Sequence, residues 1–410
     1  MSQVTAAEQS GLGQPSASRP RLIVVSAVGI AQILAWGSSY YLLAVLAGPV
    51  ARDMGWPLAW VVSGLSLGLL ISGLVSPRVG HLIDQRGGRP VLAASAIMMA
   101  VGLLVLGLAP TLPIFIAAWL LIGVGMGAGL YDPAFSTLGR LYGEHARSAI
   151  THVTLFGGFA STVCWPLSAF LIEHLGWRGA CLTYAAIQVG VVLPLYLFGL
   201  PAEEKRLPDA TRKNAGSNGR MSRTERGAFW MLAAGFTLAS VIMTVISVHL
   251  LTLLQARGIA FAAAVGFGAL IGPSQVGARV FEMAFGRKAH PIWSLLVSAV
   301  LVTVGLGMLI GAPGLAAAGI VLYGAGSGIR SIARGTVPLA LFGREGYAIM
   351  MGKIAMPALV AQAASPSLGG WLLDNFGPTV MLAALSAAAI LNIVLVLALM
   401  PYALRRPTVR

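Results

Sequence analysis

Apolar residues occur along this chain in long runs, each close to the ~20 residues that an α-helix needs to cross a lipid bilayer. Short polar segments, often with glycine or proline, separate one run from the next. We predict twelve transmembrane helices, at residues 22–48, 58–79, 91–109, 113–138, 149–174, 180–200, 229–254, 259–282, 292–310, 315–341, 347–372 and 378–400. The pattern therefore predicts an all-α membrane protein.

The composition supports this prediction and argues against a soluble enzyme. Hydrophobic residues make up 57% of the chain and charged residues only 10%, whereas soluble domains carry about 25% charged residues. No segment between predicted helices is long enough to form a soluble catalytic domain. The helices contain no pair of acids and no cluster of metal ligands, so we predict no catalytic activity, cofactor or metal site.

The net charge of +14 raises the possibility of nucleic-acid binding, but the positions of the charges indicate another cause. Among Lys and Arg residues, only Arg52, Arg178 and Arg257 fall in the loops on one side of the predicted membrane. Positive loops face the cytoplasm. We therefore predict a multi-pass inner-membrane protein with both termini in the cytoplasm, in contact with the lipid bilayer and not with nucleic acid.

A weak internal repeat divides the chain into two halves. Residues 125–129 and 324–328 both read G-x-G-x-G, and each is followed by a basic loop and a helix that contains a proline, Pro166 or Pro366. Repeats of this kind, with a site at their interface, recur in transporters. We predict a disordered N-terminal segment (1–21), a six-helix half (22–200), a cytoplasmic linker (201–228), a second six-helix half (229–402) and a tail (403–410).

The segment after the second predicted helix, residues 80–92, reads G-H-L-I-D-Q-R-G-G-R-P-V-L. It is a short basic turn that carries one acid and has glycines at fixed offsets. This pattern, G-x-L-x-D-x-x-G-x-R-x-x-L, resembles the loop 2–3 signature of the major facilitator superfamily. The resemblance covers about residues 22–402. It implies two pseudo-symmetric six-helix halves and a secondary transporter that works by alternating access.

In that superfamily the loop acts as a latch. The resemblance implies that the acid, Asp84, pairs with cations at the cytoplasmic helix ends and with the positive N-terminal end of a helix in the other half. Arg140 is the nearest candidate partner in its own half. The predicted latch comprises Gly80, Asp84, Arg86, Gly87, Arg89 and Arg140.

Two further stretches, G-P-S-Q-V-G-A-R at 272–279 and G-Y-x4-G-K-I-A at 346–355, resemble the monocarboxylate transporters and the oxalate:formate antiporters. The cations at these positions bind the substrate carboxylate in those families, which implies that role for Arg279 and Lys353. A guanidinium fork and an ammonium group suit a small carboxylate. The alternative is that both side chains extend to the membrane surface near the helix ends.

The chain departs from those families at a position that bears on proton coupling. Animal monocarboxylate transporters share an acidic residue four positions before the arginine that matches Arg279. At that position this chain has Gln275. Glutamine cannot titrate. Asp132, which follows the first glycine run, is a possible proton carrier, or it caps the following helical segment.

Aromatic residues are candidate walls of a substrate cavity. Trp36 and Tyr40 lie four residues apart in the first predicted helix and share a face, and Tyr131 follows the glycine run of the fourth. Tyrosines near a helix end are also ordinary interfacial anchors, so both interpretations stay open for them.

The sequence therefore predicts a secondary active transporter of a small organic anion, coupled to a proton or a counter-substrate and acting as a monomer. Its predicted substrate site comprises Arg279, Lys353, Trp36, Tyr40, Gln275 and Tyr131. One alternative is an efflux exporter of hydrophobic or drug-like compounds, although the predicted helix at residues 149–174 lacks the G-P-x-x-G-G signature of drug antiporters. Another is a transporter-like receptor that binds its ligand without moving it.

Overall fold

The structure is a computed structural model that describes residues 20–202, 222–286, 289–311 and 313–405. The described chain is almost entirely helical, as the spacing of its apolar runs predicts. Most of the predicted N-terminal segment, linker and tail lies outside the described residues.

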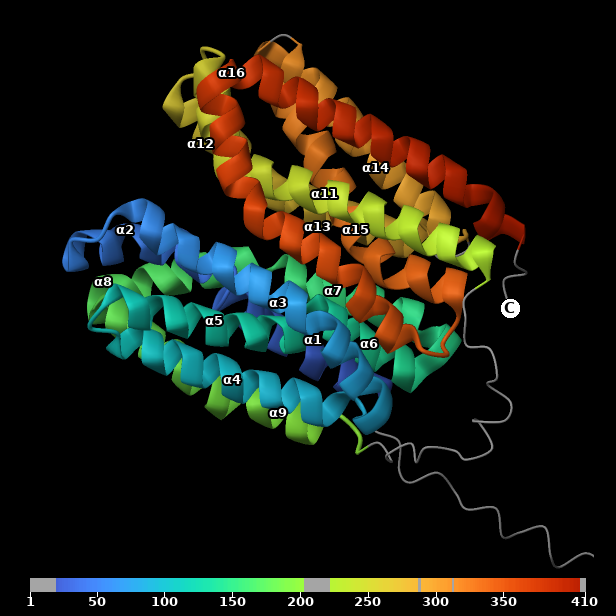
Figure 1. The fold of residues 1–410 in the computed structure, drawn as a ribbon, viewed down its shortest axis with the longest axis horizontal. Helices are drawn as coiled ribbons and strands as arrows, with labels where there is room; N and C mark the ends of the chain where they lie inside the picture. Colours follow the sequence, from blue (N-terminus) through green and yellow to red (C-terminus); the bar gives the residue numbers. More distant parts are fainter. Residues whose placement is uncertain (1–19, 203–221, 287–288, 312, 406–410) are drawn as a thin grey trace, which may run out of the picture.

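Two bundles of helices lie side by side, and each is formed by one half of the chain (Figure 1). The first contains α1 (Arg21–Gly37), α2 (Leu42–Met54), α3 (Leu58–Arg86), α4 (Gly88–Leu108), α5 (Leu112–Gly129), α6 (Tyr131–Tyr142), α7 (Ala146–Gly158), α8 (Ala160–Ile187) and α9 (Leu193–Gly199). The second contains α11 (Arg223–Ala256), α12 (Phe261–Ala269), α13 (Ile271–Phe285), α14 (Pro291–Ile310), α15 (Ala316–Phe342) and α16 (Tyr347–Arg405).

Nine helical stretches of the described chain are long and apolar enough to cross a membrane. Two of them, Ala146–Gly199 and Tyr347–Leu404, each contain two spans, because Gly176 (φ 71°, ψ 171°) and Gly377 (φ 79°, ψ 174°) break the helix. Only glycine adopts these backbone angles readily. With α15 as a further long helix, the described residues form twelve spans in two groups of six, which confirms the predicted fold class.

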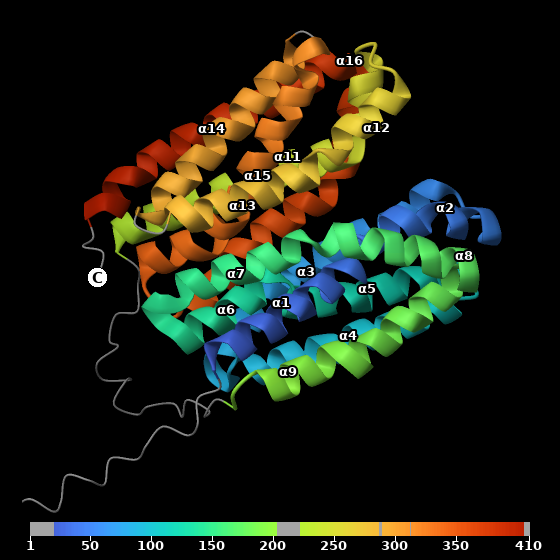
Figure 2. The same ribbon diagram turned by 180° about the vertical axis from the view of Figure 1, so that it is seen from behind.

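The halves meet most closely at the end of the molecule where the chain enters α1 and leaves α16, here called the terminal end. At this end α6 and α7 lie against α15 and α16. At the opposite end the bundles diverge, and α2 and α12 lie apart in both views (Figures 1 and 2). The molecule is therefore closed at its terminal end.

Glycines allow the helices of each half to approach closely. A Cβ atom on Gly123 or Gly127 would collide with the backbone of α3, and one on Gly125 would collide with Met99 of α4. In the second half, Gly324 and Gly328 face α13 in the same way, and Gly326 faces α14. Small residues with this role are typical of helix packing in membranes.

These contacts correct the register of the sequence repeat by two residues. Gly127 and Gly328 both pack against the second span of their half, so they are equivalent in packing. The sequence pattern instead pairs Gly129 with Gly328. In the corrected register, Gly129 of the first half corresponds to Arg330 of the second.

The turn between α3 and α4 is shorter than the sequence predicts. The second span was expected to end at residue 79, but α3 continues to Arg86 and α4 begins at Gly88. Gly87 alone lies between them, at φ 84° and ψ 167°. Asp84 therefore lies in the last turn of a helix and not in a loop.

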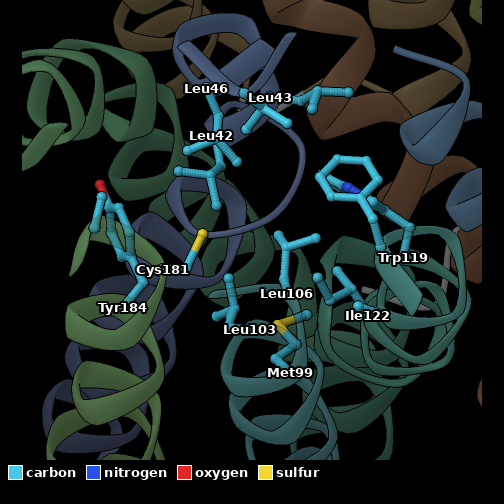
Figure 3. Packing of buried hydrophobic residues seen from close by; sticks show 14 of the residues in the cluster. Leu42, Leu43, Leu46, Met99, Leu103, Leu106, Trp119, Ile122, Cys181 and Tyr184 are labelled. Atoms are coloured by element: carbon cyan, nitrogen blue, oxygen red, sulfur yellow. The ribbon is translucent and has the colours of Figure 1, made fainter. Parts of the chain in front are cut away.

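The core of the first half fixes the position of α2 against three other helices. Figure 3 shows Leu42 and Leu46 of α2 above Leu103 and Leu106 of α4, with Trp119 of α5 beside them. All five side chains are buried. Of these helices, α5 also lines the cavity between the halves, with Met126 and Gly127.

Candidate functional site

A cavity of about 900 Å³, part of which is open to solvent, lies between the two halves. Four spans of each half contribute to its wall. The lining residues are Trp36, Tyr41, Ser72, Ser76, Met126, Gly127, Leu130, Tyr131, Asp132, Pro133, Gly157, Ser240, Met243, Gln275, Arg279, Ser327, Arg330, Ser331, Arg334, Leu359 and Gln362.

Arg279 of α13 is buried in the wall of the cavity with 5% of its surface exposed. Its Nε atom donates a hydrogen bond to Ser331 Oγ at 3.0 Å, and Nη1 donates to the carbonyl oxygen of Thr154 in the first half at 3.1 Å. A Cβ atom on Gly158 would collide with the guanidinium, so this glycine allows the approach. No carboxylate of the described residues pairs with Arg279.

Arg330 of α15 also faces the cavity, and it is 7% exposed. Its hydrogen bond within the described residues joins Nη2 to the thioether sulfur of Met243 at 3.0 Å. A thioether is a weak acceptor. No ion pair in the described part of the chain neutralises this guanidinium, although burying an unpaired charge is energetically costly.

Arg334 and Asp132 form an ion pair between the halves at the cavity. Nε and Nη2 of Arg334 donate to the two carboxylate oxygens of Asp132 at 2.7 and 2.8 Å. This is the bidentate geometry that makes arginine–carboxylate pairs strong. Asp132 lies in the first turn of α6, where the sequence allowed either a capping residue or a proton carrier.

The charges that line the cavity do not balance. Three arginines and one aspartate contribute to its wall, and the aspartate is paired with Arg334. Arg279 and Arg330 therefore leave an excess of two positive charges on the wall formed by the second half. An anion in the cavity would compensate them.

The wall formed by the first half is aromatic. The ring centroids of Trp36 and Tyr131 lie 5.0 Å apart, those of Trp36 and Tyr41 lie 6.1 Å apart, and Tyr131 stacks on Phe135 at 5.1 Å. All except Phe135 line the cavity. The Nε1 atom of Trp36 is buried without a hydrogen-bond partner in the described structure.

Most of the residues predicted for the substrate site lie around this cavity. Arg279, Gln275, Trp36 and Tyr131 line it, as does Asp132, the possible proton carrier. Their roles in binding or coupling stay predictions, because their positions alone do not establish them.

Two predicted residues lie outside the lining. Tyr40 packs against the Trp36 ring, with the centroids 5.4 Å apart, and its hydroxyl accepts a hydrogen bond from Gln362 at 3.4 Å. Lys353 is exposed. On α16 the cavity is lined by Leu359 and Gln362, and Lys353 points to another side of the helix. In this conformation Arg330, and not Lys353, lines the cavity together with Arg279; a role for Lys353 in binding stays a prediction.

Sequence reasoning missed Arg330 and Arg334. A signal for them was present, because both lie inside the predicted tenth span, four residues apart and just after the glycine run. Ionisable residues inside a membrane span are functional candidates by default, and residues at this spacing share a helix face.

The predicted latch lies at the terminal end. Arg140 donates a hydrogen bond to Asp84, but to its backbone carbonyl and not to its carboxylate. A Cβ atom on Gly80 would collide with Ala348 of α16, so the helices of the two halves touch here. The other predicted latch residues are Gly87 at the turn, Arg86, which is exposed, and Arg89, which is half-buried.

A second set of contacts joins the halves at the terminal end. Arg147 at the start of α7 donates to the carbonyl oxygens of Gly286 and Ala289 at 2.7 and 2.6 Å. Its guanidinium also lies 3.6 Å from the Glu282 carboxylate. Together with the Asp132–Arg334 pair, these contacts close the cavity towards this end.

The described chain therefore forms two six-helix halves around a central cavity that is closed at one end. The match to the family model of the Major Facilitator Superfamily covers residues 28–329. The chain belongs to this superfamily, as its loop signature and its fold indicate.

Relatives and a solved structure agree with this assignment. The chain is 28% identical to Monocarboxylate transporter 11 of Mus musculus, across 81% of this chain and 84% of the relative. It is 26% identical to the oxalate:formate antiporter of Oxalobacter formigenes, across 48% and 47%. The crystal structure of the human organic anion transporter MFSD10 (TETRAN) has the same fold, with a TM-score of 0.74, 17% identity and coverage of 93% and 100%. The predicted resemblance to these transporter families is thereby confirmed.

Proposed function

We propose that this protein moves a small organic anion, a carboxylate, across the membrane by alternating access. The observation that carries the proposal is Arg330, a buried guanidinium in the cavity wall whose hydrogen bond is to a thioether. A substrate carboxylate would supply the missing acceptor oxygens and the missing negative charge. The printed names of two relatives, a monocarboxylate transporter and an oxalate:formate antiporter, support this class of substrate.

Arg279 completes the site from a neighbouring helix. Its Nε and Nη1 atoms are held by Ser331 and by Thr154, so the guanidinium is oriented before a substrate arrives. Its bond from Nη2 to Gln275 is long, at 3.4 Å, and can be exchanged for a shorter bond to a carboxylate. Charge-assisted bonds of this kind are about twice as strong as neutral ones.

Alternating access requires that the contacts at the terminal end break when the opposite end closes. These contacts are the Asp132–Arg334 pair, the bonds of Arg147, and the bond from Arg279 to Thr154. We place the terminal end in the cytoplasm of an inner-membrane protein on the basis of the positive loops, so the cavity faces outward in this conformation.

Asp132 is the candidate for coupling to a proton, because it is the acid that lines the cavity. Its protonation would release Arg334 and remove an ion pair between the halves. The alternative is exchange, in which a counter-substrate anion occupies the same arginines on the return step. Transport of the anion with and without a pH gradient across vesicles distinguishes the two.

The test of the proposal is ligand-induced thermal stabilisation of the purified protein, with a panel of carboxylates, neutral solutes and drugs. A ligand that binds the folded state raises its stability by mass action. We expect carboxylates to stabilise the wild type and Arg52→Gln, in which an exposed arginine outside the cavity is changed. Arg330→Gln should lose this response. Stabilisation by hydrophobic compounds that persists in Arg330→Gln would refute the proposal and favour an exporter.

A further inference from the structure

The two walls of the cavity differ in chemistry, and this difference points to the shape of the substrate. We propose that the substrate is an aromatic carboxylate that spans the cavity. Its carboxylate binds Arg279 and Arg330 of the second half, and its ring lies against Trp36 and Tyr131 of the first half. This inference rests on the proposed transport of carboxylates and narrows the class of carboxylate.

The position of the carboxylate follows from the charges. Arg279 and Arg330 lie on α13 and α15, and both belong to the second half. The first half contributes one charged residue to the lining, Asp132, and its carboxylate is occupied by Arg334. An anionic group is therefore bound on one side of the cavity only.

The position of the ring follows from the aromatic wall. Trp36 and Tyr131 lie in contact with each other, and Tyr131 is fixed by stacking on Phe135 with an angle of 12° between the planes. A Cβ atom on Gly157 would collide with the Tyr131 hydroxyl, so α7 holds the side chain from behind. Rigid aromatic side chains bind a planar ring at a small loss of conformational entropy, and ring pairs prefer offset or edge contacts.

The aromatic wall also holds a hydrogen-bond donor without an acceptor. Trp36 Nε1 is buried and has no partner in the described structure, whereas buried polar groups are almost always bonded. The side chain lines the cavity. A polar substituent on the substrate ring, such as a hydroxyl or carbonyl oxygen, would accept this bond after a rotation of the Trp36 side chain that exposes Nε1 to the cavity.

A short acid does not use these features. Formate or oxalate would satisfy the arginines but would leave the Trp36 donor and the aromatic wall without contacts. Trp36 and Tyr131 line the same cavity as Arg279 and Arg330, so a longer acid would contact both walls. Because such a substrate touches both halves, its body would also stabilise their approach during transport.

The experiment compares four acids that share one head group and differ in the body, using full-length protein in lipid nanodiscs. The acids are 3-(4-hydroxyphenyl)propionate, 3-phenylpropionate, 3-cyclohexylpropionate and propionate, with affinity measured by calorimetry. We expect affinity to fall in this order, with about fivefold between phenylpropionate and cyclohexylpropionate, because an aromatic pair adds ~1 kcal/mol beyond burial.

Variants assign the effect to the aromatic wall. Trp36→Phe keeps a ring and removes the Nε1 donor, so it should abolish the advantage of the hydroxyl group and keep that of the phenyl ring. Trp36→Leu should remove the preference for phenylpropionate over cyclohexylpropionate. Trp230→Phe is the matched control, since Trp230 is 62% exposed and lies outside the cavity.

Each outcome separates the two proposals. If none of the acids binds, in wild type and control alike, the proposed transport of carboxylates fails. If propionate and cyclohexylpropionate bind as tightly as phenylpropionate, the aromatic substrate class is refuted and carboxylate transport stands. The order of the four affinities in the wild type decides the question even if Trp36→Leu does not fold.

Discussion

The two halves of this transporter share a scaffold and differ in chemistry. Both use alternate glycines on their fourth span to pack against the second and third spans, and both break a long helical stretch at one glycine, Gly176 or Gly377. At the position where the first half has Gly129, however, the second half has Arg330. A repeated scaffold suits a rocking movement, whereas the site depends on residues that break the repeat.

The division of chemistry extends over the whole cavity. The second half supplies Arg279, Arg330 and Arg334, and the first half supplies aromatic rings and Asp132. A substrate bound by only one half would move with that half and would not link the two. The proposed aromatic carboxylate would touch both walls, and its binding would then be coupled to closure.

The largest effect is expected from the scaffold itself. Gly127→Val and Gly328→Val would each drive a side chain into the backbone of the neighbouring span, at Ser72 and Gln275. Overpacking of this kind destabilises by ~1–3 kcal/mol, and the spans have no room to separate without losing their other contacts. Both variants should lose most of their monodisperse protein in size-exclusion chromatography.

The control for the scaffold is Gly307→Val, because a Cβ atom there meets no atom within 4 Å. It should purify like the wild type. If one of the two glycine variants lost most of its monodisperse protein and the other lost none, the glycine packing would matter in one half only. That result would contradict the view that the halves share a scaffold.

The next effect concerns the ion pair that joins the unlike halves. Asp132→Asn would leave Arg334 without its bidentate partner. Because both side chains line a cavity that is partly open to solvent, the loss is smaller than the about 3–5 kcal/mol for a fully buried pair. We expect the conformation that is closed at the terminal end to lose at least tenfold in population. Spin-label distances across that end measure the change.

The double variant Asp132→Asn/Arg334→Gln sharpens this prediction, because it removes the pair without leaving a charge. It should recover a large part of the closed population, because the free-energy effects of substitutions at two residues in contact do not add. If it shifts the equilibrium as far as the sum of the single variants, the pair does not hold the halves together.

A smaller effect is expected at the latch. Asp84→Asn keeps the backbone carbonyl to which Arg140 donates, so the contact between α3 and α6 is retained. The Asp84→Asn protein should fold, and its transport rate should be ~2–5-fold below that of the wild type. The transport rate of Arg140→Gln should be lower still. Transport rates of reconstituted protein test this order. If Asp84→Asn transports more slowly than Arg140→Gln, the carboxylate of Asp84, and not the bond from Arg140, would be the main part of the latch.

The sequence predicted the fold well because its signals are local. Runs of apolar residues and the glycine-rich turn at residues 80–92 place the spans, and the bilayer leaves few alternatives to helices. The boundaries were less accurate. The end of α3 was predicted seven residues early, since Asp84 and Arg86 look like loop residues but lie in a helical turn.

The site was predicted only in part, because it depends on contacts between distant segments. Arg279 and Trp36 were found from a family resemblance and an aromatic pair. The partner of Asp132 is 202 residues away, at Arg334, and no local pattern indicates such a pair. Lys353 was chosen by spacing, which does not show the side of the helix that faces the cavity.

The smallest effect is expected at His290, which lies between α13 and α14 outside the spans. Burial, and secondly the nearby Arg147 guanidinium, lower the pKa of this histidine below its ordinary value of 6.5. Among the described residues, Arg147 and Glu282 are charged groups near this histidine, and they pair at 3.6 Å. The neutral ring is therefore favoured while the terminal end is closed.

Opening of the terminal end would separate His290 from Arg147 and let the pKa rise. Since the open conformation then binds the proton more readily, the closed population is constant well above pH 6.5 and falls as the pH drops through the window below this value. We expect a shift of ~2–3-fold in the ratio of the two conformations, measured by the same spin-label distances.

His290→Gln, which cannot titrate, should remove this pH dependence and leave the ratio at neutral pH unchanged. A pH dependence that survives in His290→Gln would show that the acid sensitivity does not arise from the segment between α13 and α14.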